Sequence, residues 1–69
     1  MDVKQVGTLI RKRREGLRLR QEDLADMSGV GLKTLHLVEQ GSGNPSFDTL
    51  QKIAEVLGLE ILVKVKGVS

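Results

Sequence analysis

The sequence predicts an all-α (mainly α) domain of four short helices that ends in a β-strand. Apolar residues recur at intervals of three and four along most of the chain, and glycine-containing turns separate these periodic stretches. After Gly58 the period changes, and apolar residues alternate with mostly polar ones. We therefore expect a helical domain in residues 1–58 and a strand in residues 59–69.

Composition restricts the class of protein. A chain of 69 residues makes one small domain, which is marginally stable alone, so we expect a partner chain. The absence of cysteine excludes disulfides and cysteine-based zinc sites. The sequence also has no apolar run long enough to cross a membrane, and we therefore expect a cytoplasmic protein. One histidine, no phosphate-cradling glycine loop and no suitable pair of carboxylates argue against an enzyme. We expect no catalytic residue, no metal and no cofactor.

The first helix is predicted over residues 3–15. Asp2 and Gln5 have the spacing of an N-terminal capping pair, and Gly16 ends the apolar periodicity. Gly7 lies inside this helix, where glycine costs about 1 kcal/mol relative to alanine. Two interpretations stay open, namely a close helix crossing at Gly7 or simple tolerance of the residue.

The second and third helices, predicted over 21–27 and 32–40, are joined by a tight turn. Gly29 occupies the position where the second helix needs a left-handed cap, and Val30 is expected to fill the corner between the helices. The residues expected to face inward are Leu24, Ala25, Leu35 and Val38. This arrangement is a helix-turn-helix, which places its second helix in the DNA major groove, although ordinary helix packing produces the same spacing.

The fourth helix is predicted to begin after Ser46, a good N-cap residue, and to end at Gly58. Its apolar stripe consists of Phe47, Leu50, Ile53, Ala54 and Leu57. We expect Phe47, the only aromatic residue, to fill the core and not to stack on a base.

Basic residues are concentrated near the end of the first helix. Within ten residues only Glu15 opposes the cluster, which consists of Arg11, Lys12, Arg13, Arg14, Arg18 and Arg20. Such a density is typical of contact with phosphates, and the alternative is a solvated helix face.

The alternating tail needs a partner, because the backbone groups of a single strand have none inside a helical domain. The residues predicted to form the pairing strand are Leu59, Ile61, Val63 and Val65. Pairing with the same strand of a second copy around a two-fold axis is the simplest solution. A frayed tail and a strand that lies along its own helices are the alternatives.

Taken together, these segments of the chain resemble the Xre family of phage-repressor-type helix-turn-helix proteins. The matching segments, which span roughly residues 6 to 58, include IRKRR (10–14), LRQEDLADMSGV (19–30), TL (34–35), EQG (39–41) and NPSFDTL (44–50). The resemblance implies a lambda-repressor-like fold. A strand in place of the family's fifth helix is similar to HipB-type antitoxins, whose tails pair across a dimer and whose partner is a HipA-type kinase toxin.

The resemblance also implies roles for individual residues. Gln21 matches a glutamine that contacts a phosphate and supports the reading helix, and Arg14 and Glu39 match a structural salt bridge. The positions implied to lie at DNA are Arg20, Gln21, Gly31, Leu32, Lys33, Thr34, His36, Leu37, Gln40, Ser42 and Asn44. The family usually has serine or threonine at positions 20 and 31, so Arg20 and Gly31 depart from its pattern. Arginine has no side-chain acceptor with which to cap a helix.

Helical geometry agrees with most of these roles. Lys33, His36, Leu37 and Gln40 fall on the side of the third helix opposite Leu35 and Val38. Lysine donates to guanine or to phosphate, and leucine meets thymine methyl groups. We therefore expect a dimeric, sequence-specific repressor that binds a palindromic operator. The alternative is an antitoxin that acts mainly by neutralising a kinase toxin.

Overall fold

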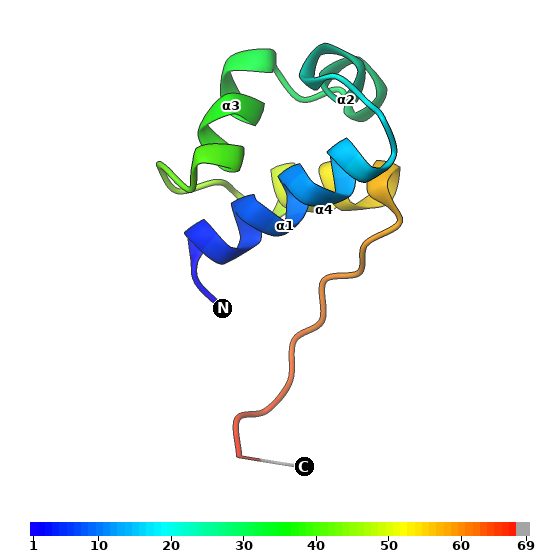
Figure 1. Cartoon of the computed structure of the whole chain (residues 1–69). Helices are drawn as coiled ribbons and strands as arrows, with labels where there is room; N and C mark the ends of the chain where they lie inside the picture. Colours follow the sequence, from blue (N-terminus) through cyan, green and yellow to red (C-terminus); the bar gives the residue numbers. More distant parts are fainter. Residues whose placement is uncertain (68–69) are drawn as a thin grey trace.

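The computed structural model describes residues 1–67 of the chain. Its elements, in chain order, are α1 (Val3–Gly16), α2 (Gln21–Ser28), α3 (Leu32–Gln40) and α4 (Phe47–Leu57). The prediction of a mainly α domain of four helices is confirmed, and α1 and α2 each extend one residue beyond the predicted end. The helices surround one core, with α2 and α3 together at one end of the molecule (Figure 1).

Local signals in the sequence place the helix ends. Asp2 accepts a hydrogen bond from the backbone N–H of Gln5, and the Gln5 side chain accepts one from the N–H of Asp2, each at 2.9 Å. Ser46 caps α4 by accepting from the N–H of Thr49 at 3.1 Å. Gly29 ends α2 with a φ of 74°, a left-handed conformation that glycine adopts without strain.

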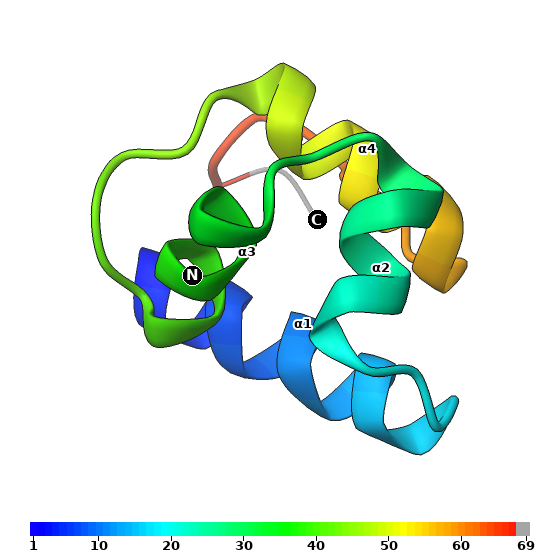
Figure 2. The ribbon, with the colours of Figure 1, turned by 90° about the horizontal axis from the view of Figure 1, so that it is seen from above.

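The core lies where the four helices meet, as the view from above shows (Figure 2). All four inward positions predicted for the helix-turn-helix are buried, and Val30 fills the corner between α2 and α3. The buried apolar residues are Ile10, Leu24, Ala25, Val30, Leu35, Val38, Ile53, Ala54 and Leu57.

The crossing of α1 and α3 is unusually close, and this decides between the two interpretations of Gly7. A Cβ atom at Gly7 would overlap the carbonyl oxygen of Val38 and lie 3.1 Å from that of Glu39. Gly41, at the end of α3, faces α1 in the same way, with 2.7 Å between an added Cβ and the Cα of Lys4. Glycine at both positions lets the two backbones touch.

The expected burial of Phe47 is wrong, because 60% of this side chain is exposed. Burial decreases along α4 towards its N-terminus. Leu57 and Ile53 are fully buried, whereas Leu50 is only partly buried. Phe47, one further turn back, lies beyond the edge of the core, although it continues the same helical stripe.

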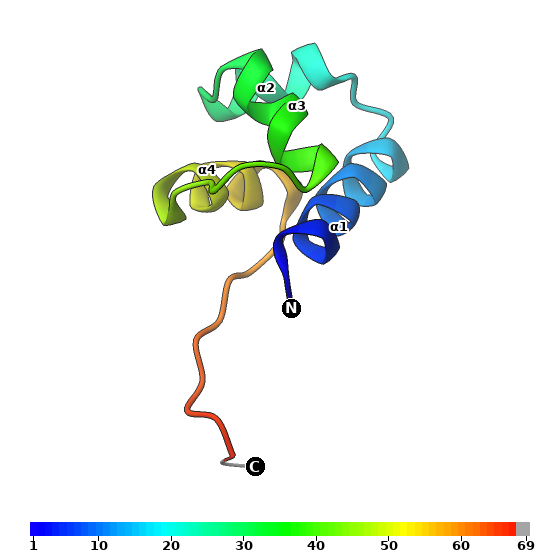
Figure 3. The same ribbon diagram turned by 90° about the vertical axis from the view of Figure 1, so that its left-hand side faces the viewer.

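The tail after α4 contains no β-strand in the described residues. The backbone N–H of Leu59 donates to Ala54 O at 2.9 Å. Beyond Glu60 the tail runs away from the end of the molecule where α2 and α3 lie (Figures 1 and 3). A β-strand needs a second strand to accept and donate its backbone hydrogen bonds, and the described residues of a single chain provide none. Pairing of the tail with a second copy therefore stays a prediction. Val68 and Ser69, the last residues of the predicted strand segment, lie outside the described residues.

None of the helices described in residues 1–67 has the length and hydrophobicity needed to cross a membrane.

Candidate nucleic-acid interface

No other helix of the domain packs on the outer face of α3 (Figure 3). Leu35, Val38 and Glu39 point into the domain, whereas Lys33 and Gln40 lie exposed on the opposite side. Two further residues flank Lys33 and Gln40 on the helix surface. Leu37 is 41% exposed, and His36 is half-buried. The face therefore combines hydrogen-bond donors with apolar surface.

The flanks of this face carry five more of the residues that the sequence places at DNA. Gly31, Leu32 and Thr34 are exposed at the start of α3. Ser42 and Asn44 are exposed in the loop that follows it. A shallow hollow joins the two groups, and it is lined by Thr34, Leu37, Val38, Ser42, Gly43, Asn44 and Pro45. The structure thus brings together residues from both ends of α3.

A buried acid supports α3 from behind. Glu39 has a side chain that is 3% exposed, and it accepts two hydrogen bonds from Arg14, at 2.7 Å from Nε and 3.0 Å from Nη2. Gln21 donates a third from Nε2 at 3.0 Å, and Arg14 also donates to the carbonyl oxygen of Leu19 at 2.8 Å. The hydrogen bond to Glu39 raises the pKa of Arg14 above its usual value, so the guanidinium stays charged.

This network ties three helices to one carboxylate. Arg14 comes from α1, Gln21 from the first position of α2, and Glu39 from the last turn of α3. Since a buried ion pair with satisfied hydrogen bonds has one favourable geometry, the network fixes the angle at which α3 projects from the domain.

The basic cluster is not one phosphate-binding group, which corrects the sequence interpretation. Arg13 donates from Nε to the carbonyl oxygen of Leu57 at 2.8 Å and so caps α4, while Arg14 is held by Glu39. Within residues 1–67, the basic side chains of the cluster that form no ion pair and no hydrogen bond are Arg11, Lys12 and Arg18. The role of Arg13 had no local signal, because its acceptor is 44 residues away.

Arg20 is exposed at the start of α2 and interacts with Asp23. Its guanidinium lies 3.0 Å from Asp23 Oδ1, and its backbone N–H donates to Oδ2 at 2.8 Å. These hydrogen bonds hold the pKa of Asp23 below its usual value. The contact therefore stabilises the fold above the unfolded-state pKa of about 3.9, and its contribution is lost as the pH falls through the lower folded-state pKa.

We predict that Arg20→Thr stabilises the fold and weakens DNA binding. A threonine hydroxyl can accept the N–H of Asp23, which arginine cannot, and such a cap contributes about 1 kcal/mol. The exposed ion pair that is lost contributes less. Urea denaturation and a DNA titration measure the two effects. Arg20→Ala is the control, which removes the same charge without adding a cap, and a lower midpoint for Arg20→Thr than for Arg20→Ala contradicts the capping argument.

Comparison with known proteins agrees with this geometry. A family model described as helix-turn-helix matches residues 10–63. An uncharacterized HTH-type transcriptional regulator of Methanothermobacter thermautotrophicus is 43% identical over 53 residues, which are 77% of each chain. The ImmF control region 10 kDa protein of Bacillus phage phi105 is 33% identical over 91% of this chain and 70% of its own length.

A putative HTH-type transcriptional regulatory protein of Methanococcus maripaludis (strain C5) is 35% identical over 91% of this chain. The chain spans only 18% of the length of that relative.

The fold and the exposed third helix define a helix-turn-helix domain, a class that binds DNA. The chain belongs to the helix-turn-helix family, and the resemblance to its Xre-type members is confirmed.

Proposed function

We propose that the chain is a transcriptional regulator, a repressor, that places α3 in the major groove of an operator. The observation that carries the proposal is the outward face of α3, held at a fixed angle by the buried pair of Arg14 and Glu39. An α-helix with side chains is about 10–12 Å wide, and the major groove is about 12 Å wide. The names of the relatives, which describe HTH-type transcriptional regulators, support the same function.

The residues of the proposed interface divide into two groups. Lys33 and Gln40 supply donors for base edges or phosphates, and Leu32 and Leu37 supply contacts for thymine methyl groups. Thr34 also belongs to the group that approaches base edges. The backbone contacts fall to residues around the ends of α3 and at the start of α2, namely Arg20, Gln21, Gly31, His36, Ser42 and Asn44. In this assignment the 1–58 segment is the DNA-binding domain.

We expect Lys33→Ala to separate base reading from phosphate binding. If Lys33 donates to a base, the variant loses about 1–3 kcal/mol of preference at one position of the operator. If it contacts a phosphate, affinity falls evenly across sequences, and the slope of log K against log salt decreases by about 1. A titration on the DNA upstream of the gene, repeated at several salt concentrations, distinguishes the two. The absence of any DNA binding by the wild-type chain contradicts the proposed function.

We further propose that the chain acts as a homodimer that pairs its tails from residue 59 onward. The accessible surface is 5140 Å², whereas a compact monomer of this mass exposes about 4300 Å². The excess is close to the roughly 800 Å² that one partner buries in a standard interface. Much of it is apolar, because Leu62, Val63 and Val65 are largely exposed.

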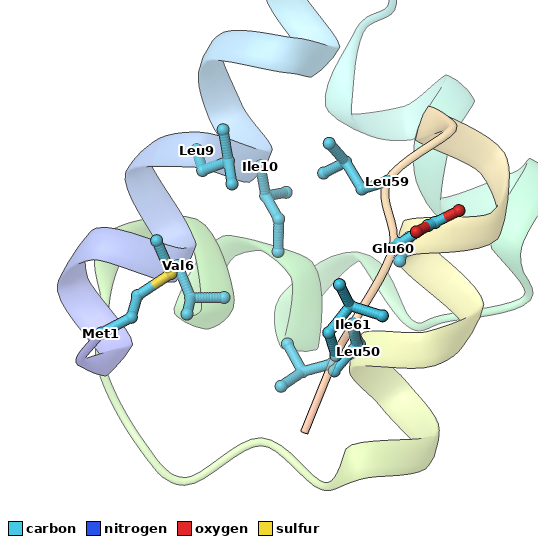
Figure 4. A pocket seen from close by; sticks show the side chains of 10 residues that line it. Met1, Val6, Leu9, Ile10, Leu50, Leu59, Glu60 and Ile61 are labelled. Atoms are coloured by element: carbon cyan, nitrogen blue, oxygen red, sulfur yellow. The ribbon is translucent and has the colours of Figure 1, made fainter. Parts of the chain in front are cut away.

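A groove beside the tail adds to this apolar surface (Figure 4). It lies between α1 and α4 and is lined by Met1, Val6, Leu9, Ile10, Leu50, Ala54, Leu59, Glu60, Ile61 and Leu62. The tail runs away from the end of the molecule that carries α3, so paired tails would leave the outer face of α3 accessible (Figure 1). Two copies related by a two-fold axis would then read half-sites about 34 Å apart.

We predict that Val63→Asp weakens the dimer at least tenfold. Val63 is 91% exposed in the single chain, but it belongs to the alternating apolar set with Leu59, Ile61 and Val65, so pairing would bury the new carboxylate at a cost of several kcal/mol. Sedimentation over a concentration series measures the effect. Lys64→Asp introduces the same residue on the opposite side of the alternation and is the control. Equal dimer constants for Val63→Asp and the wild type count against pairing through this set.

The antitoxin role stays a prediction from the resemblance of the tail to HipB-type proteins. It requires a complex with a HipA-type kinase encoded next to the gene. A titration against such a neighbouring kinase tests it, and the absence of a complex removes it without affecting the proposed DNA binding.

A further inference from the structure

We propose that Arg11 and Gln21 together hold one phosphate of the DNA backbone, in a hollow beside the outer face of α3. The inference deepens the proposed function and rests on it. The resemblance already implies a phosphate contact for Gln21, so the new part of the inference is Arg11. This residue is not among those that the resemblance places at DNA, and in the sequence it is one member of an undifferentiated basic cluster.

The hollow lies where three helices meet. Arg11 comes from α1, Gln21 from the start of α2, and His36, Glu39 and Gln40 from α3, and all five line the same concave surface. His36 and Gln40 also belong to the outer face of α3. The hollow is therefore continuous with the surface that we assign to the major groove, so DNA bound there would bring a backbone phosphate close to it.

The charges in the hollow favour an anion. Glu39 is the only acid that lines it within the described residues, and its carboxylate is already neutralised by Arg14 and accepts three hydrogen bonds. Arg11 has no ion-pair partner in residues 1–67, so its positive charge is uncompensated. The hollow thus carries about one net positive charge.

The donors suit a phosphate. The planar guanidinium of Arg11 can donate two parallel hydrogen bonds to two phosphate oxygens. Gln21 uses one of its two amide N–H groups on Glu39, which leaves the second N–H for an oxygen in the hollow. Arg14 cannot serve instead, because its guanidinium is occupied by Glu39 and by the carbonyl oxygen of Leu19.

The neighbouring Lys12 provides a matched control. It is also exposed and without an ion pair in the described part of the chain, but it lines a different hollow, together with Met1, Lys4, Gln5, Thr8 and Leu9. Successive residues of a helix point about 100° apart, so Lys12 faces away from the hollow that Arg11 lines.

The test compares Arg11→Gln and Lys12→Gln by titration of the full chain against a labelled DNA duplex of mixed sequence, over roughly 50 to 200 mM KCl. For Arg11→Gln we expect a slope of log K against log salt that is smaller by about 0.9 for each bound subunit, with a similar loss of affinity on every sequence. Lys12→Gln should keep the wild-type slope. Thermal unfolding should be unchanged in both variants, since neither side chain has a bonded partner in residues 1–67.

Three outcomes overturn the inference. An unchanged slope for Arg11→Gln removes the contact while the proposed function survives. An equal decrease in both variants indicates a diffuse positive field and not a localised phosphate. Stabilisation of the wild type, but not of Arg11→Gln, by inorganic phosphate at constant ionic strength and without DNA would instead support the hollow as a phosphate site. A wild-type chain that binds no duplex at all contradicts the proposed function and the inference together.

Discussion

Glu39→Gln is expected to cost about 3–5 kcal/mol of folding free energy, which is a large part of the roughly 3–10 kcal/mol available to a domain of this size. The substitution keeps the shape of the side chain but removes its charge. Arg14, whose side chain is only 11% exposed, is then left charged in the interior without its counterion. Urea or thermal unfolding followed by circular dichroism measures the loss.

An exposed pair is the control for this prediction. Asp48 and Lys52 form an ion pair at 3.1 Å on the surface of α4, and Asp48→Asn makes the same acid-to-amide change there. We expect a loss below about 1 kcal/mol. A double variant that replaces Arg14 with methionine and Glu39 with leucine should be more stable than Glu39→Gln, because it leaves no unpaired charge. A loss below 1 kcal/mol for Glu39→Gln would show that the network does not hold α3.

Gly7→Ala is expected to destabilise the fold by about 2 kcal/mol or more, although helix propensity alone predicts a gain of about 1 kcal/mol. The new Cβ would overlap the carbonyl oxygen of Val38. Because the overlapping atom belongs to the backbone, α1 and α3 have to move apart to relieve it. Equilibrium denaturation gives the sign directly.

Gly16→Ala is the matched control in the same helix. A Cβ at Gly16 meets no atom within 4 Å, so the propensity term acts alone, and the change should be neutral or stabilising by up to about 1 kcal/mol. If Gly7→Ala also stabilises the fold, the close contact between α1 and α3 is contradicted.

The helices could be predicted from the sequence because each is marked by local chemistry. Capping by Asp2 and Ser46 and the left-handed cap at Gly29 depend on residues only a few positions apart. Phe47 shows where this reasoning stops. Its spacing in the stripe predicts which face of α4 turns inward. The spacing alone does not show how far along α4 the neighbouring helices extend, and Phe47 lies beyond their end.

The interface was harder to predict because it depends on distant partners. Arg14 and Glu39 are 25 residues apart, and only the resemblance to a family suggested their pairing. In the sequence the residues of the basic cluster cannot be told apart. In the fold, however, Arg13 binds the end of α4 and Arg14 lies in the interior. Arg11 can be distinguished only once α2 and α3 are placed against α1.

The separation between the two sides of α3 has a consequence for how such a domain diversifies. The inner side, with Leu35, Val38 and Glu39, sustains the architecture, while Lys33 and Gln40 on the outer side have no hydrogen-bonded partner in the described chain. Mutations can therefore accumulate on the outer side at little thermodynamic penalty. A lineage that carries this scaffold can acquire new target sequences by exchanging a few surface side chains, without having to evolve a new fold each time.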